Sequence, residues 1–207
     1  MPQALKHYGD CYKPRELYNI IAEDVEFYVQ SGGGITCSGG EPLSQPDFLT
    51  EFLRICKDSD IHCAVDTSGH AQWEIFKRIL PYTDIFLYDI KHLDPDEHEK
   101  LTGIDNRLIL DNLIKLSNNN IPVEIRMMII PGFNDKTEDI EKTADFLNKI
   151  KTIKSIRLLP YHGLSGTKYK SINKKYNMPE ITNDIKTVLD KVFNILSTKG
   201  LQCKITK

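Results

Sequence analysis

The sequence predicts an α/β fold in which helices cover a parallel sheet, arranged as a (β/α) barrel. Apolar, strand-like segments alternate with amphipathic, helix-like segments along the 207 residues. Several of the strand-like segments are almost continuously apolar, which is typical of parallel strands covered on both faces. Five strand-like segments in succession end in a polar or glycine-bearing stretch. Barrels carry their functional groups at this end of their strands.

The amino-terminal half predicts three of the strands. After a short lead-in, a helix is expected from Pro14 to about Gln30, because its apolar residues recur with helical spacing. The expected strands of this half are residues 35–37, 62–65 and 84–90. The expected helices that follow them are residues 46–58, 72–80, 94–101 and 107–118. Ser44 is the expected cap of the first of these helices.

The carboxyl-terminal half continues the same alternation. Two further strands and a possible edge strand are expected at residues 123–130, 155–159 and 201–205. Two further helices are expected at residues 137–151 and 183–198. Thr137 is the expected cap of the first, and a polar loop is expected to reach about Pro179 before the second. No repeat or linker divides the sequence, which therefore predicts one domain.

The composition excludes several classes of function. The chain has 27 basic and 29 acidic residues and a net charge of −2. This balance gives no signature of a nucleic-acid or anionic membrane surface. No apolar run reaches membrane-spanning length and no signal peptide is apparent, so a cytoplasmic protein is expected. The five cysteines are odd in number and widely spaced, which favours reduced thiols over disulfides or a zinc site.

The polar stretches at the strand ends are expected to meet at one mouth, because parallel strands all end on the same side. They read SGGE, DTSG, DIKH, PGFND and PYHG. Asp66 and Asp89 could reach one cation, Lys91 and Arg126 could hold a carboxylate, and His162 could contact a ring. The whole candidate set is Gly39, Gly40, Glu41, Asp66, Asp89, Lys91, Arg126 and His162. Together these side chains suit a zwitterionic ligand that carries a ring.

Each of these residues also has a plainer reading when it is taken alone. Asp66 could cap a helix, Lys91 could be a solvated loop charge, and His162 could be a satisfied loop histidine. Five polar strand ends in a row make coincidence less probable than any one of them does. The sequence contains no serine elbow, zinc-protease helix or phosphate-binding lysine loop. The residues themselves therefore predict a polar ligand mouth on a parallel barrel and leave the chemistry open.

Five motifs resemble, in order and spacing, the radical SAM activating enzymes of glycyl radical enzymes, the family of pyruvate formate-lyase activating enzyme. They are SGGEPL at 38–43, VDTSG at 65–69, YDIKH at 88–92, IRMMIIPGFND at 125–135 and LLPYHGLSG at 158–166. The resemblance covers nearly the whole chain. It implies S-adenosylmethionine and a [4Fe–4S] cluster as cofactors and a glycyl radical enzyme as partner. It also implies a low-potential reductant such as flavodoxin or ferredoxin, and an anaerobic setting.

The resemblance assigns roles to the residues of the mouth. Gly39, Gly40 and Glu41 would form the loop that binds the amine of S-adenosylmethionine. His162 would lie near its adenine, and Arg126 would line the mouth. These assignments are expectations that follow from the resemblance alone.

The tips of the next two strands receive roles in the same way. Asp89, Ile90 and Lys91 would belong to the cofactor site, along the methionine and ribose portions. Asp66, Thr67 and Asp89 would match a monovalent-cation site beside the cofactor's carboxylate. No catalytic residue of the chain's own is identified.

The chain departs from the family pattern at its beginning. The CxxxCxxC loop that would hold the cluster does not occur, and the sequence opens with the helix that would follow the first barrel strand. Residues 1–13 resemble the tail of a ferredoxin-like insert, and residues 14–207 resemble an incomplete radical SAM barrel. The expected fold is thus an incomplete parallel barrel of about five strands plus the possible edge strand. It corresponds to about the carboxyl-terminal two-thirds of an activating enzyme.

Two functions remain open at this point. The chain either belongs to a radical SAM activase or is a non-catalytic barrel that binds S-adenosylmethionine or a partner. By itself it is expected neither to hold a [4Fe–4S] cluster nor to cleave S-adenosylmethionine. Residues 34–38 are expected to form an exposed sheet edge. Such an edge favours self-association, or mobility of residues 1–34.

Overall fold

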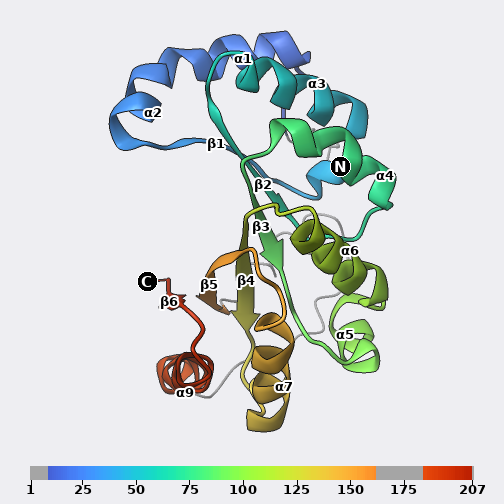
Figure 1. Cartoon of the computed structure of the whole chain (residues 1–207), viewed down its shortest axis with the longest axis vertical. Coiled ribbons are helices and arrows are strands. Elements are labelled where there is room, and N and C mark those ends of the chain that lie inside the picture. The colour runs from blue at the N-terminus through green and yellow to red at the C-terminus, as the bar shows by residue number, and fades with distance from the viewer. Residues whose placement is uncertain (1–8, 162–183, 207) are drawn as a thin grey trace, which may run out of the picture.

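Six parallel strands form one open sheet in the order β1-β2-β3-β4-β5-β6 (Figure 1). The computed structural model describes residues 9–161 and 184–206. The strands are β1 Gly34–Cys37, β2 His62–Thr67, β3 Ile85–Asp89, β4 Val123–Ile129, β5 Ile153–Pro160 and β6 Cys203–Ile205. Each strand pairs in parallel with the next. The expected incomplete parallel barrel is confirmed, including its carboxyl-terminal edge strand.

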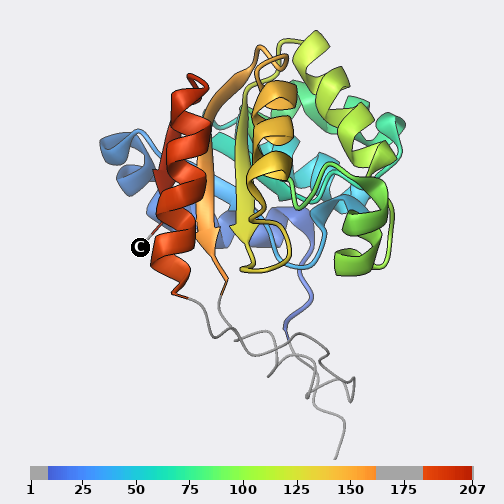
Figure 2. The ribbon, with the colours of Figure 1, turned by 90° about the horizontal axis from the view of Figure 1, so that it is seen from below.

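The helices follow the strands and wrap the convex side of the curved sheet (Figure 2). They are α1 Pro14–Ile21, α2 Val25–Ser31, α3 Pro46–Lys57, α4 Trp73–Ile79, α5 Pro95–Thr102, α6 Arg107–Asn118, α7 Thr137–Leu147 and α9 Ile185–Thr198. Among the described residues, no helix is long and apolar enough to cross a membrane.

The core lies between the sheet and these helices. Alternate strand residues point toward the helices, as the two-residue repeat of a strand requires. Phe86, Tyr88, Ile125 and Ile156 are fully buried in this layer. Burial of one such side chain contributes about 1.5–3 kcal/mol relative to exposure. The intervening strand residues are turned to the concave side, and this placement brings Asp66, Asp89 and Arg126 to the same side of the sheet.

The amino-terminal helix differs from the expectation of one helix from Pro14 to Gln30. It is broken by a 3₁₀ turn at Ala22–Asp24 and resumes as α2. Leu17, Ile21 and Val25 contact the core, as their spacing predicts, whereas Ile20, expected on the same face, is exposed. No residue of α1 or α2 is fully buried. The apolar residues thus keep helical spacing on both sides of the turn. They are not fully buried because the surface against which α1 and α2 could pack ends at α3 and β1.

Two expected helix caps are wrong. The Ser44 hydroxyl donates to the Glu41 carbonyl oxygen at 2.6 Å within a 3₁₀ turn, and α3 begins only after Gln45. Thr137 is the first helical residue of α7 and follows Lys136, which gives no side-chain cap. Helix α7 ends at Leu147, earlier than the expected residue 151. The other observed boundaries lie within a few residues of those expected, which is the usual precision of such boundaries.

Candidate functional site

The loop after β1 leaves its backbone open to the concave side. Gly39 has φ +122°, a conformation that favours glycine, and a Cβ on Gly39 or Gly40 would meet no atom within 4 Å. A ligand could therefore approach this backbone more closely than it could approach a loop that carries side chains.

The Glu41 carboxylate ties this loop to the turn after β2. Its Oε1 accepts from the Leu43 N–H at 3.1 Å and from the Thr67 hydroxyl at 2.7 Å. Its Oε2 accepts from the Ser68 N–H at 3.0 Å and from the Ser68 hydroxyl at 2.6 Å. The two loops belong to neighbouring strands of the sheet. Glu41 therefore makes three hydrogen bonds between the two motifs.

Asp66, at the tip of β2, is paired with Arg126 of β4. One guanidinium nitrogen of Arg126, Nη1, donates to Asp66 Oδ2 at 2.6 Å, and the Ser38 hydroxyl donates to the same oxygen at 2.8 Å. About a quarter of the Arg126 side chain and a fifth of the Asp66 side chain are exposed. The Arg126 Nε is buried and has no acceptor among the described residues. A charged side chain within an apolar strand is rarely buried unless it is paired, and Asp66 is the partner of Arg126.

Asp89, at the tip of β3, is paired with Lys91. The Lys91 ammonium donates to Asp89 Oδ2 at 2.8 Å, and both side chains are 33% exposed. Ile90, between them, has a different place. Its side chain is buried in the core, and its N–H donates to the Arg126 carbonyl oxygen at 2.9 Å. Of these three residues, Asp89 and Lys91 therefore present their side chains at the strand tip, and Ile90 does not.

These side chains line one cavity of about 290 Å³ at the strand tips. The lining residues are Ser38, Gly39, Gly40, Glu41, Asp66, Thr67, Ser68, Asp89 and Lys91. Arg126 reaches the same place through its ion pair with Asp66. His162 lies outside the described residues. The structure thus brings the expected residues from three successive strand ends together, and Arg126 from a fourth strand contacts them.

The charges in this cavity compensate one another. Lys91 and Arg126 could hold a ligand's carboxylate, and in this structure each holds a carboxylate of the chain itself. Asp66 and Asp89 lie on adjacent strands, as expected, but each faces its own cation. In the described part of the chain, no three His, Cys, Asp or Glu residues are grouped closely enough to hold a metal ion.

Residues behind the cavity support the turn after β2, and the sequence did not single them out. Gly69 has φ +78°, and a Cβ there would lie 1.9 Å from the Tyr88 hydroxyl oxygen. The Asn112 amide donates to the Gly69 and Ala71 carbonyl oxygens at 2.9 and 2.8 Å. The Tyr88 hydroxyl donates to the Ile109 carbonyl oxygen at 2.7 Å. Burial, and then the negative charge of Glu41, raises the pKa of Tyr88. Tyr88 is therefore a neutral donor at neutral pH.

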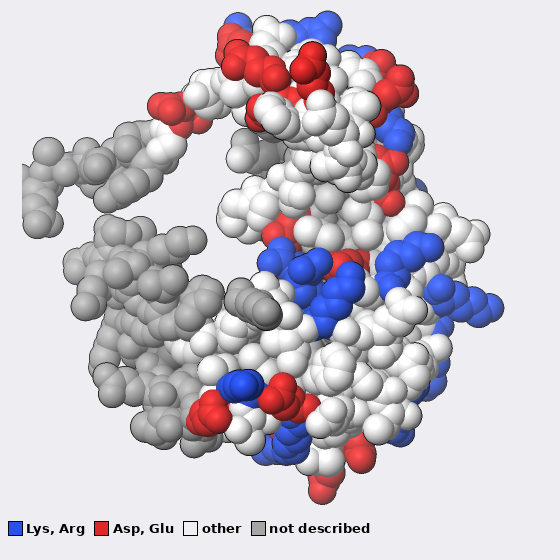
Figure 3. All heavy atoms as spheres, turned by 90° about the vertical axis from the view of Figure 1, so that its left-hand side faces the viewer, with Lys and Arg blue, Asp and Glu red and all other residues white. Residues whose placement is uncertain are grey.

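A second polar cluster on the concave side was also missed. Glu124 of β4 is 8% exposed and accepts from Arg157 Nε at 2.7 Å and from the Ser155 hydroxyl at 2.8 Å. Burial alone would raise the pKa of Glu124, but the hydrogen bonds from Arg157 and Ser155 outweigh it and lower the pKa. Figure 3 shows Lys and Arg side chains gathered in the middle of one face, below an acidic region. Glutamate in an apolar strand was the available signal in the sequence.

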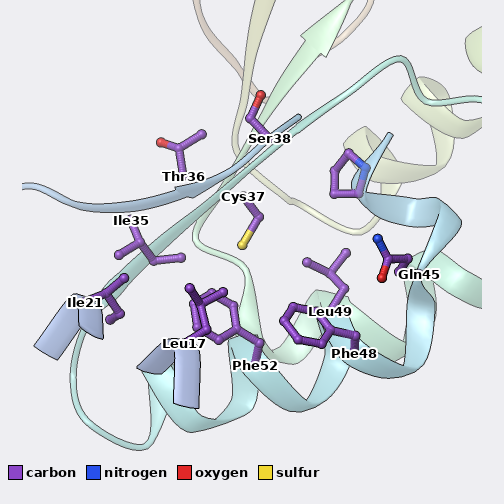
Figure 4. A pocket seen from close by; sticks show the side chains of 11 residues that line it. Leu17, Ile21, Ile35, Thr36, Cys37, Ser38, Gln45, Phe48, Leu49 and Phe52 are labelled. Carbon is purple, nitrogen blue, oxygen red and sulfur yellow. The ribbon is translucent and has the colours of Figure 1, made fainter. Parts of the chain in front are cut away.

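An apolar cavity of about 310 Å³ lies on the other side of β1 (Figure 4). Ile35 and Cys37 point toward it together with Leu17 and Phe52 of the flanking helices, whereas Thr36 points away. Burial raises the pKa of Cys37 to about 12, so its thiol is protonated at neutral pH. The edge strand β1 is therefore bordered by apolar side chains that α1 and α3 only partly cover.

Comparisons with known proteins agree with this geometry. Residues 9–147 match the model of the radical SAM superfamily. The chain is 38% identical over 200 residues to trans-4-hydroxy-L-proline dehydratase activating enzyme of Clostridioides difficile, covering 95% of this chain and 66% of that protein. It is 40% identical over 166 residues to pyruvate formate-lyase-activating enzyme of Clostridium pasteurianum, covering 80% of this chain and 69% of that protein.

A solved structure shows the same likeness. A domain of pyruvate-formate lyase-activating enzyme from Bacteroides vulgatus superposes with a TM-score of 0.69 at 31% identity, covering 84% of this chain and 99% of that one. The chain spans 66%, 57% and 60% of the length of the first three curated relatives. The sequence motifs, the parallel sheet and these matches together show that the chain belongs to the radical SAM superfamily, and within it to the activating enzymes of glycyl radical enzymes.

Proposed function

We propose that the chain binds S-adenosylmethionine in the strand-tip cavity and takes part in activating a glycyl radical enzyme. The observation that carries this proposal is the meeting of an open glycine loop with two ion pairs in one cavity. The ligand's amino-acid portion carries both an ammonium and a carboxylate, and the cavity offers partners for each. The relatives named as activating enzymes support the second half of the proposal.

The chain's own residues bind and orient this ligand. The backbone of Gly39 and Gly40 accepts close approach of the ammonium. Lys91 provides the cation for the carboxylate by exchanging its present partner, Asp89. The buried Arg126 Nε is a donor that no described residue uses. We further propose that His162 meets the adenine and that Ile90, whose side chain is buried in the core, takes part in the cofactor site only through its backbone.

The same cavity is our proposed place for a monovalent cation, with Asp66, Thr67 and Asp89 as its ligands. Hard cations prefer oxygen ligands, and the carboxylates of Asp66 and Asp89 and the carbonyl oxygen of Thr67 would supply them. Asp66 and Asp89 each have one carboxylate oxygen that no hydrogen bond or ion pair within the described chain uses. The cation would compete with Arg126 and Lys91 for the two carboxylates.

A [4Fe–4S] cluster, when bound, supplies the electron for reductive cleavage of S-adenosylmethionine in this family. The described cysteines do not fit such a cluster. Among the described residues no three His, Cys, Asp or Glu side chains are grouped closely enough to hold a metal ion, and burial raises the pKa of Cys37 to about 12 and that of Cys203 to about 11. Cluster ligands are closely spaced thiolates. We therefore assign no cluster ligand and no redox step to the described residues.

We also propose the setting in which the chain acts. Its partner would be a glycyl radical enzyme, and flavodoxin or ferredoxin would supply the electron under anaerobic conditions in the cytoplasm. The nearly balanced charge supports a protein partner rather than nucleic acid or a membrane surface. The alternative function, a non-catalytic barrel that binds S-adenosylmethionine or a partner, is favoured by the cysteine arrangement.

Titration calorimetry with S-adenosylmethionine tests the binding proposal. We expect saturable binding by the chain, and Lys91→Ala should weaken it about tenfold or more because a charge-assisted hydrogen bond is lost. Lys77→Ala, which removes an exposed lysine of α4, is the matched control and should leave the affinity unchanged. If the unaltered chain shows no binding, the proposal is wrong.

Anaerobic reconstitution with iron and sulfide separates the two functions. We expect no stoichiometric iron and no 5′-deoxyadenosine on reduction of the chain alone. Stoichiometric iron together with 5′-deoxyadenosine would contradict that expectation and favour the activase. Genomic DNA upstream of Met1 gives an independent reading, because an in-frame CxxxCxxC there would also favour the activase.

A further inference from the structure

Glu41 lines the ligand cavity, yet its carboxylate is already fully used within the protein. A carboxylate offers about four acceptor positions. In this structure four donors fill them: the Leu43 N–H, the Thr67 hydroxyl, and the N–H and hydroxyl of Ser68. All four distances lie between 2.6 and 3.1 Å.

The direction of these hydrogen bonds is fixed by their neighbours. The Thr67 hydroxyl oxygen accepts from the Gly69 N–H at 3.0 Å, so its single hydrogen is directed to Glu41. The Ser68 hydroxyl oxygen is 3.4 Å from the His70 N–H and likewise donates to Glu41. The turn after β2 is thus built to present donors to this carboxylate.

The Glu41 backbone is anchored as well. Its carbonyl oxygen accepts from the Ser44 N–H at 3.0 Å and from the Ser44 hydroxyl at 2.6 Å. The position of Gly39 and Gly40 relative to the turn after β2 therefore depends on Glu41, which adds three hydrogen bonds to the single one that Ser38 makes with Asp66.

We infer that Glu41 is a positioning residue: its carboxylate fastens the glycine loop of β1 to the turn after β2, and the loop backbone, not this carboxylate, meets the ligand. This inference rests on the proposed S-adenosylmethionine site and gives a different role to one of its residues. It makes Thr67 and Ser68 partners of Glu41 and gives their hydroxyl groups an effect on ligand binding that passes through Glu41.

The test combines ligand affinity with amide hydrogen exchange of the ligand-free chain. Ser68→Ala, Thr67→Val and Glu41→Ala should each weaken S-adenosylmethionine binding, the first two by about tenfold and Glu41→Ala by more, because hydrogen bonds to a charged group are lost. Each should also speed exchange in both residues 38–44 and residues 66–70. Thr67→Ser keeps the donor and should restore affinity to within about twofold of the unaltered chain.

A double-mutant cycle separates positioning from direct contact. If the hydroxyls act through Glu41, then Glu41→Ala with Ser68→Ala binds no more weakly than Glu41→Ala alone. If Glu41 instead touches the ligand directly, Ser68→Ala removes a competing hydrogen bond from the Glu41 carboxylate, and affinity for the ligand is kept or increased. In that case Glu41→Ala also leaves amide exchange in residues 66–70 unchanged. That second pattern would overturn the inference.

Two controls keep the outcomes distinct. Thr50→Val removes a hydroxyl that bonds only to the Pro46 carbonyl oxygen within α3, and it should change neither affinity nor exchange at the two loops. If the unaltered chain fails to bind S-adenosylmethionine, the proposed function fails, while the exchange measurements still test the connection between the loops. Unchanged exchange in both loops of Glu41→Ala would contradict the connection itself.

Discussion

The middle of the sheet and its β1 edge are built from similar apolar patterns but end in different states. Around β3, Phe86 and Tyr88 are fully buried, and the polar tips are paired. Around β1, helices α1 and α2 bury no residue fully, and Phe27 and Val29 are 67% and 77% exposed. Apolar periodicity therefore reports which residues could be buried, whereas burial also requires a neighbouring element to pack against.

The largest expected difference in stability between the two regions comes from removing one phenylalanine ring in each. Phe86→Ala should lower the free energy of unfolding by about 3–5 kcal/mol, because it removes a fully buried ring and leaves a cavity. Phe27→Ala, the matched change on the exposed side of α2, should change it by less than about 0.5 kcal/mol. Urea denaturation measures both. Equal losses for the two variants would show that Phe27 is covered in solution.

The second effect compares two glycines in left-handed conformations. Gly69→Ala should cost about 2–4 kcal/mol, because the new methyl group meets the Tyr88 hydroxyl and the residue keeps a positive φ. Gly32→Ala, at φ +64° after α2, has open space around its Cβ and should cost about 1–2 kcal/mol. Thermal unfolding gives the ranking. Adding Tyr88→Leu, which removes the hydroxyl oxygen and the Cζ that lie 1.9 and 2.1 Å from that Cβ, should reduce the cost of Gly69→Ala, and an unchanged cost would contradict the clash.

The third effect concerns pH and the buried Glu124. Its pKa is lowered in the folded chain, so its ionised form stabilises the fold above the ordinary glutamate pKa of about 4.3, and this contribution is lost as the pH falls through the lowered value. Glu124→Gln should cost about 2 kcal/mol at pH 7, and the difference should shrink toward pH 3. Glu23→Gln on the exposed turn between α1 and α2 is the control. If the difference in unfolding free energy between the unaltered chain and Glu124→Gln grows on acidification, the pKa of Glu124 is raised by folding and not lowered.

The smallest effect on the free energy of unfolding is expected for Thr36→Lys at the β1 edge. Its main effect should be on self-association of the chain. Strand β1 pairs only with β2 in the described chain, and neither proline nor charge protects residues 35–37. Light scattering after size exclusion should show self-association that Thr36→Lys reduces. A monomer with slow amide exchange at residues 31–38 would instead show that the edge is covered, with the lead-in at residues 1–13 as the first segment to test.

Most of the fold followed from the sequence because it depends on local patterns. Alternating strand and helix signals fixed the parallel order, and the strand-end stretches placed Asp66, Asp89 and Lys91 at one cavity. The cap at Ser44 and the unbroken helix to Gln30 failed. Capping depends on the direction of a single side chain, and the helix depends on the surface it meets. The Glu124 cluster escaped notice because its partners come from the next strand.

By itself the sequence determined the class of fold, the family and the residues that gather at the strand tips. These properties follow from periodicity and motif order, which neighbouring residues along the chain define. Only the tertiary structure decided that Arg126 holds Asp66, a residue 60 positions earlier in the chain, and that the Glu41 carboxylate joins its own loop to Thr67 and Ser68 at the end of β2. Such pairings depend on which strands lie side by side and on where their side chains point, and neither is encoded in any short stretch of sequence.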